Sequence, residues 1–266
     1  RVHGLRVPSR VVLQRWQSQL WQSVRRCAMR PAADLFKRNR FARLFAVSKC
    51  AELLLDDAYG ATRGVVELRV EAESTRLFDD IVETRSDVRA GLSLHGWQIK
   101  RQSTDLSADV VSQLFVALRD QQHLTTGNLA VSDSVSITGA GPLRILRDLC
   151  SRLSAEGAER PDVMNALTRE EEFWVQFAIR ATGSDTAGTD VLSRLRVHIL
   201  GDERAIEDRA RAFLPGLYLE PIRSVLDALE SLVSGVDGSV LISAAVLRAK
   251  LLHVANQARP FADASS

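Results

Sequence analysis

The 266-residue sequence has only three cysteines, Cys27, Cys50 and Cys150, and they lie far apart along the chain. An odd number of widely spaced cysteines, with no Cys-x-x-Cys and no Cys/His cluster, argues against a disulfide framework and a structural zinc site. We therefore expect buried thiols in a reducing compartment, and a cytoplasmic protein.

The sequence also lacks a long apolar run and a strong excess of either charge. No run approaches the roughly 18–20 apolar residues of a membrane span, and we expect no membrane contact. The 35 basic and 33 acidic residues leave a net charge of +2, so nucleic-acid binding would need a local basic patch. Neither G-x-x-x-x-G-K-[ST] nor G-x-G-x-x-G occurs, which predicts no NTPase within this sequence.

Lysine is scarce as well: only four of the 35 basic residues are lysines, and the other thirty-one are arginines. One of the four, Lys100, ends the apolar run Leu92–Ile99, which predicts a mostly buried strand. Gln98 and Lys100 share one face of that strand, because side chains alternate with a period of two. A lysine at the end of a buried strand must lose its hydration, pair with an acid or serve a functional role. The alternative is that its side chain extends to solvent.

Two adjacent carboxylates, Asp79 and Asp80, lie inside Leu77–Val82, which otherwise has the pattern of a short strand. Two acids in an apolar strand repel each other and are costly to desolvate unless a cation is bound there. Antiparallel pairing of the two strands would place Asp80 beside Gln98 and Lys100. A third predicted strand, Val65–Val70, precedes them and leads into two further acids, Glu71 and Glu73.

This order of a helix over 41–58, a strand leading to a glutamate, an Asp-Asp-Ile-Val strand and a Gln-x-Lys strand followed by a helix resembles the PD-(D/E)xK nuclease superfamily. The likeness is greatest to its Gln-x-Lys branch, and within it to the effector nuclease domains of bacterial antiphage defence. Those domains are fused to cyclic-oligonucleotide sensors or to STAND-type NTPases. The motif covers about a quarter of the chain. The resemblance implies an α/β (α+β) fold with a restriction-endonuclease-like core, a small mixed sheet flanked by helices.

The resemblance also implies a Mg²⁺-dependent deoxyribonuclease, expected to be an endonuclease, with Mn²⁺ as a substitute ion. Lys100 would orient the attacking water or stabilise charge in the transition state, and Asp80 with a glutamate and the Gln98 amide oxygen would hold the metal. Which glutamate takes part stays open between Glu71 and Glu73. The expected catalytic set is Asp80, Gln98, Lys100, Glu73, Glu71 and Asp79, and the expected metal ligands are Asp80, Glu73 and Gln98. The implied partners are double-stranded DNA, further copies of the chain, and a sensor or NTPase domain, fused or separate.

Basic residues near the first helices are candidate phosphate contacts. The densest group is Lys37-Arg38-Asn39-Arg40, and a solvated helix surface explains it equally well. Lys49, in the middle of the helix over 41–58, is expected at the surface. The expected nucleic-acid-binding residues are Lys37, Arg38, Arg40, Lys49 and Arg101.

The remaining sequence predicts a mostly helical C-terminal part. We expect a helical extension over 1–40, a nuclease core over 41–140 and a helical region over 141–266, with residues 182–190 as the most linker-like segment. A helix is expected over Val240–Val254. The acidic triplet Glu170–Glu172 suits a helix start better than a metal site. The alternative to a nuclease is a non-catalytic helical interaction or oligomerisation module with a degenerate nuclease fold.

Overall fold

A computed structural model describes residues 39–60, 63–71, 77–87, 90–100, 106–132, 136–137, 141–156, 164, 166–214, 222–236 and 238–255. All of them belong to one compact unit, Ala32–Ser266. No helix in these ranges is long and apolar enough to cross a membrane.

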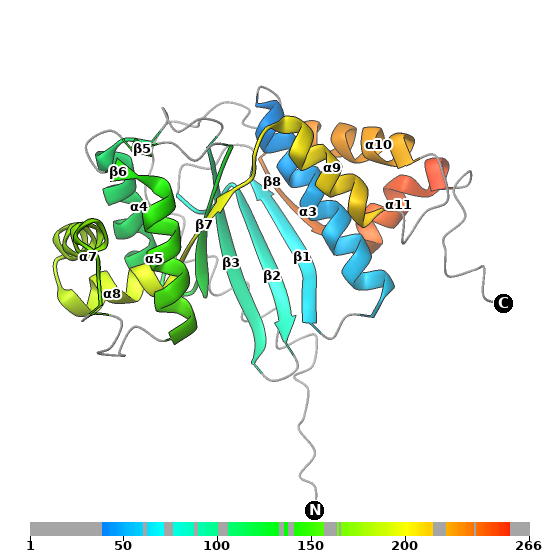
Figure 1. Cartoon of the computed structure of the whole chain (residues 1–266). Coiled ribbons are helices and arrows are strands. Elements are labelled where there is room, and N and C mark those ends of the chain that lie inside the picture. The colour runs from blue at the N-terminus through cyan, green and yellow to red at the C-terminus, as the bar shows by residue number, and fades with distance from the viewer. Residues whose placement is uncertain are drawn as a thin grey trace, which may run out of the picture. The chain divides into compact units, whose positions relative to one another are not determined.

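The unit is built around a six-stranded mixed sheet in the order β7-β4-β3-β2-β1-β8 (Figure 1). The strands are β1 (Arg63–Glu71), β2 (Ile81–Asp87), β3 (Gly91–Lys100), β4 (Thr126–Val131), β7 (Leu195–Ile199) and β8 (Ser239–Ser243). Neighbours among β8, β1, β2 and β3 are antiparallel, whereas β3, β4 and β7 are parallel to one another. A parallel pair needs a crossover, and α4 (Ala108–Asp120) supplies it between β3 and β4.

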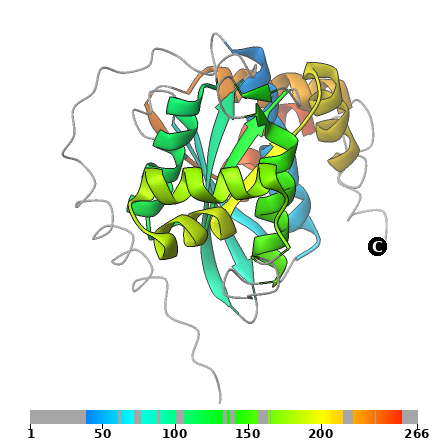
Figure 2. The same ribbon diagram turned by 60° about the vertical axis from the view of Figure 1, so that its left-hand side comes forward.

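Helices cover both faces of the sheet. One core joins strand residues such as Leu68 and Ile81 to α3 (Arg40–Ala58), α9 (Glu203–Phe213), α10 (Ile222–Ser234) and α11 (Ala244–Ala255). The other joins residues such as Val82 and Leu129 to α4, α5 (Leu143–Glu156), α7 (Arg169–Thr182) and α8 (Asp185–Arg194). Ile81 and Val82 are consecutive and point to opposite faces, and Figure 2 shows α7 and α8 in front of the sheet. The expected mixed sheet flanked by helices is confirmed.

Local chemistry explains where the helices begin and end. Thr168 and Glu171 form a capping box at the start of α7, and Gly183 ends that helix with a φ of 87°. The acidic triplet Glu170–Glu172 therefore lies in the first helical turn, as predicted. Cys50 and Cys150 are buried, and desolvation raises the pKa of each thiol to about 12. Two of the three cysteines are thus buried thiols, and Cys27 lies outside the described residues.

Two sequence predictions for the C-terminal part are wrong. The linker-like segment 182–190 contains the start of α8, because the Ser184 side chain accepts a hydrogen bond from Ala187 N and caps a helix there. The helix predicted over Val240–Val254 is instead β8 followed by α11. Ile242 is fully buried beside Leu68 of β1, so the segment is held as a strand by pairing with β1.

The sheet takes strands from both sides of the boundary expected near residue 140. β7 and β8 come from the C-terminal part, and β8 pairs with β1 over Glu67–Glu71. A short hairpin of β5 (Ser136–Ile137) and β6 (Gly141–Pro142) lies between α4 and α5 in the chain. The C-terminal part therefore contributes to the same sheet that carries the predicted catalytic residues.

Candidate active site

A row of polar residues crosses four strands at the end of the sheet where β1 and β3 finish and β2 begins (Figure 1). Ile81 pairs with Val70 on one side and Trp97 on the other. One step along, the backbone N–H of Glu71 donates to Asp80 O over 3.1 Å, and the Asp80 and Gln98 side chains are in contact. Ser239 of β8 pairs with Glu71. The register therefore places Ser239, Glu71, Asp80 and Gln98 side by side.

Asp80 is the most buried acid of the row, with 5% of its surface exposed. Its Oδ2 accepts two hydrogen bonds, from Gln98 Nε2 over 2.6 Å and from the backbone N–H of Ile99 over 2.7 Å. Gln98 Oε1 accepts from the backbone N–H of Phe78 over 3.2 Å, which fixes the orientation of the amide. In the described part of the chain, the hydrogen bonds to the Asp80 carboxylate both end on Oδ2, and Oδ1 is the carboxylate oxygen left for another partner.

The buried position changes the acidity of Asp80. Desolvation is the largest effect and, with the nearby charge of Asp79, it raises the pKa of Asp80 to about 7. The hydrogen bond from Ile99 N–H and the positive charge of Lys100 lower the pKa of Asp80, but by less than burial raises it. A carboxyl group with such a pKa changes charge near neutral pH, which is typical of functional sites.

Asp79 and Asp80 are adjacent but have different partners. Asp79 Oδ1 lies 3.2 Å from Arg69 Nη2, and Arg69 Nε lies 3.3 Å from Glu71 Oε1. Glu71 Oε1 also accepts a hydrogen bond of 2.6 Å from Ser239 Oγ. Asp79 is thus tied to an arginine, and Glu71 is held through one oxygen. The sequence analysis predicted neither Arg69 nor Ser239. Arg69 could have been found, because it lies two residues before Glu71 on the same strand and therefore on the same face.

Lys100 is half-buried at the end of β3, on the strand face that Gln98 uses. Its charge stabilises the ionised form of Asp80, and among the described residues no carboxylate lies within ion-pair distance of its ammonium group. A half-buried lysine without a carboxylate partner can accept an anionic group. The predicted placement of Asp80 beside Gln98 is therefore found in the structure, with Lys100 in electrostatic contact.

An irregular turn brings Asp80 into the row. The sequence predicts a strand through Leu77–Val82, but the structure begins β2 at Ile81 and has Phe78 at a φ of 65°, which is rare for a bulky residue. Gly96 of β3 permits this turn, because a Cβ there would lie 2.4 Å from Phe78 O. Positive φ at a non-glycine residue is costly and is concentrated at functional sites.

The donor atoms of the row suit a hard divalent cation only in part. Among the described residues, no three His, Cys, Asp or Glu side chains are arranged to hold a metal. Mg²⁺, however, is commonly held by one or two carboxylates together with substrate phosphates and water. Asp80 and Glu71 each have one oxygen engaged and one without a described hydrogen bond. The Gln98 oxygen predicted as a ligand is instead occupied by Phe78 N–H.

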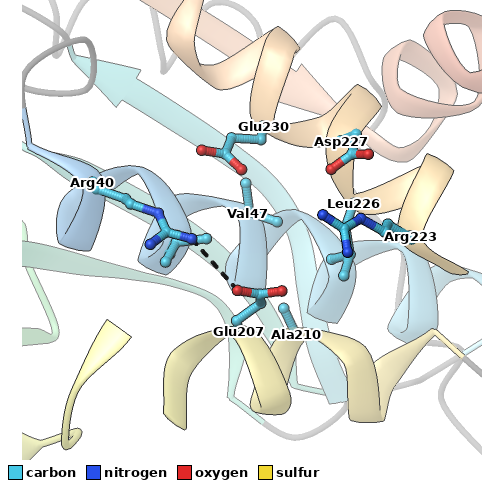
Figure 3. Close-up of a pocket in the computed structure, with 9 residues that line it drawn as sticks. Arg40, Val47, Glu207, Ala210, Arg223, Leu226, Asp227 and Glu230 are labelled. Atoms are coloured by element: carbon cyan, nitrogen blue, oxygen red, sulfur yellow. Dashed lines mark ion pairs between the residues drawn. The ribbon is translucent and has the colours of Figure 1, made fainter. Parts of the chain in front are cut away.

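The other predicted site residues are distributed more widely. Arg40 is exposed at the start of α3 and pairs with Glu203 over 3.1 Å and with Glu207 over 3.7 Å. It borders a hollow of about 130 Å³ between α3, α9 and α10, whose lining also includes Val47 and Leu226 (Figure 3). The residues of the expected set that lie outside the described part are Lys37, Arg38, Glu73 and Arg101.

The prediction that Lys49 lies at the surface is wrong, because the side chain is buried. Only 4% of it is exposed, and its ammonium group lies 2.7 Å from Glu83 and 2.9 Å from Glu52. The same group lies 4.3 Å from the centre of the Trp97 ring. Arg85 completes the network by pairing with both glutamates. Lys49 is thus an internal charge that ties α3 to β2, and its surroundings leave it no role as a surface phosphate contact.

His95 lies on the opposite face from Gln98, as strand parity predicts. Its Nδ1 is 2.7 Å from Thr126 Oγ1, and its Nε2 is 2.8 Å from Ser93 Oγ. His198 lies 3.0 Å from Asn128 Oδ1, and burial lowers its pKa to about 4. Both histidines therefore serve in hydrogen-bonded contacts between strands, away from the acidic row.

Comparison with known proteins gives a likeness of fold. No protein-family model matches the chain, and no curated protein matches it. Among solved structures, the Acinetobacter baumannii Cap4 SAVED/CARF-domain containing receptor with the cyclic trinucleotide 2'3'3'-cAAA matches with a TM-score of 0.50 and 11% identity, over 87% of this chain and 47% of that chain. The Moraxella osloensis Cap4 SAVED/CARF-domain containing receptor matches with a TM-score of 0.47 and 10% identity, over 83% of this chain and 48% of that one. The chain spans about half the length of these proteins.

Proposed function

We propose that this chain is a Mg²⁺-dependent nuclease that hydrolyses DNA and acts as the effector of a bacterial antiphage defence protein. The observation that carries the proposal is the contact of Asp80 with Gln98 on the strand end that also bears Lys100. The order of elements α3, β1, β2, β3 and α4 agrees with the layout expected from the resemblance to PD-(D/E)xK nucleases. The choice of DNA and the defence role rely on that resemblance.

In this proposal each residue of the row has a separate task. Asp80 and Glu71 would hold Mg²⁺ through the carboxylate oxygens that have no described hydrogen bond. The bound ion would polarise the phosphate and lower the pKa of a water ligand. Gln98 orients Asp80 through the 2.6 Å hydrogen bond. The ammonium group of Lys100 would bind a phosphate oxygen or orient the attacking water, and would stabilise negative charge in the transition state.

Plasmid cleavage tests the proposal. Wild-type protein at high concentration with Mg²⁺ would be compared with Asp80→Asn, Lys100→Ala and an EDTA control. Matched controls are Asp208→Asn and Lys250→Ala, because both residues are exposed and lie on helices α9 and α11. Loss of cleavage in EDTA and in the two site variants alone supports the nuclease. Cleavage that survives Asp80→Asn and Lys100→Ala would refute the site.

A second candidate is an oligonucleotide-sensing domain, because a structural neighbour is a receptor with the cyclic trinucleotide 2'3'3'-cAAA. Calorimetric titration of that compound into the wild-type chain tests it directly. Binding that is insensitive to Lys100→Ala, with no plasmid cleavage, would favour the sensor over the nuclease. We place the nuclease first because the sensor is supported by a likeness of fold alone.

A further inference from the structure

Two residues, Ser239 in the row and Arg69 beside it, contact Glu71, one of the two glutamates between which the sequence left the choice open. Ser239 Oγ donates to Glu71 Oε1 over 2.6 Å, and Arg69 Nε lies 3.3 Å from the same oxygen. Arg69 Nη2 reaches Asp79 Oδ1 at 3.2 Å. Ser239 donates a hydrogen bond to Oε1 and Arg69 forms an ion pair with the same oxygen, so Oε2 of Glu71 is the one without a described contact.

Ser239 and Arg69 differ in charge, and they therefore act differently on a cation. Ser239 is neutral, so its hydrogen bond orients the carboxylate without opposing a positive ion. Arg69 is positively charged, and its side chain is only 14% exposed, beside Glu71 at 20% and Asp79 at 16%. Charges in so shielded a position are weakly screened by salt. A divalent cation that binds Glu71 must therefore overcome repulsion from Arg69.

We propose that Ser239 and Arg69 are positioning residues of the metal centre: Ser239 orients Glu71 as the acidic partner of Asp80, and Arg69 sets how tightly the centre holds a divalent cation. This inference depends on the proposed function, since it concerns the same cation. It assigns Glu71 to the site and makes β8, from the C-terminal part of the chain, a component of it. Neither residue touches the reacting atoms.

The inference predicts opposite changes in Mn²⁺ affinity for the two residues. Ser239→Ala removes the orienting hydrogen bond and should weaken Mn²⁺ binding about three- to tenfold. Arg69→Gln removes the opposing charge and should tighten Mn²⁺ binding about three- to tenfold, while cleavage falls because Glu71 and Asp79 lose their shared restraint. A purely structural role would weaken binding in both variants.

The experiment is a calorimetric titration of Mn²⁺ into the full chain, with thermal unfolding of each variant as a check on folding. Conservative variants keep the test valid if alanine disturbs the edge strand. Ser239→Thr retains a hydroxyl and suits a strand, so it should bind as the wild type does. Arg69→Lys retains the charge, so it should not reproduce the tighter binding of Arg69→Gln. Ser234→Ala is the matched serine control, because Ser234 donates to Ser231 O within α10.

The outcomes separate this inference from the proposed function. Wild-type binding that is lost in Asp80→Asn, with unchanged affinity in Ser239→Ala and Arg69→Gln, would overturn the inference and leave the nuclease standing. Failure of Ser239→Thr to restore the affinity lost in Ser239→Ala would also overturn it. Equal Mn²⁺ affinity in wild type and Asp80→Asn would refute the metal centre itself, and the inference with it.

Discussion

Replacing Asp80 by asparagine should make the protein more stable at alkaline pH. The folded protein keeps a proton on Asp80 up to about pH 7, whereas the ordinary pKa of the group is 3.8. Between these values the folded state binds more protons than the unfolded state, so wild-type stability falls as the pH rises through this window. Asparagine does not titrate, and its side-chain oxygen can accept the hydrogen bond that Ile99 N–H donates to Asp80.

The size of the effect follows from the two pKa values. Each pKa unit corresponds to about 1.4 kcal/mol. Between pH 5 and pH 8 the ionisation of Asp80 should therefore lower the free energy of unfolding of the wild type by about 2.5 kcal/mol. The difference in unfolding free energy between Asp80→Asn and wild type should therefore grow by about that amount across the same range.

Urea denaturation in the absence of divalent ions, at pH 5, 6, 7 and 8, measures the difference. Asp208→Asn is the matched control, because Asp208 is exposed on α9, and it should show no comparable trend. A gap between Asp80→Asn and wild type that stays constant with pH, or that narrows as the pH rises, would contradict the argument that burial penalises the charged form of Asp80.

Three further predictions concern the candidate site and the charge network around Lys49. Plasmid cleavage should rise about tenfold per pH unit below about pH 7 and level off above it, since Asp80 must lose its proton to bind a cation; a flat pH–rate profile would contradict this. Lys49→Met should cost on the order of 3 kcal/mol in urea denaturation, because it leaves Glu83, 1% exposed, without its nearest cation, and the double variant with Glu83→Gln should recover much of the loss. Gly96→Ala should cost about 1–3 kcal/mol and abolish cleavage, because its Cβ would collide with Phe78 O; full activity in this variant would refute the role of the Phe78 turn.

The strands that carry the candidate site could be predicted from alternation and from scarce residue types. Lys100 stands out among four lysines, and strand parity alone puts Gln98 on its face and His95 on the other. The contact between Asp80 and Gln98 follows from pairing two neighbouring strands, which is a local relationship in the chain. These predictions succeeded because they needed only period-two alternation and one short connection.

The parts that escaped prediction depend on contacts between distant segments. Ser239 follows Glu71 by 168 residues, and nothing local marks the apolar segment around it as an edge strand. Lys49 has an ordinary helical sequence context, and only the glutamates on β2 and α3 make it internal. The Phe78 turn was missed because its conformation depends on the absence of a Cβ at Gly96, on a different strand.

The long separation between Glu71 and Ser239 in the sequence also affects when the site can form during synthesis of the chain. A ribosome that has made the chain as far as α10 has already produced Asp80, Gln98 and Lys100, but not the strand that orients Glu71. The acidic row is complete only once β8 has been made and has paired with β1. A nascent or prematurely ended chain therefore lacks the strand that holds Glu71, and in the proposed nuclease metal binding at this site would have to await the synthesis of β8.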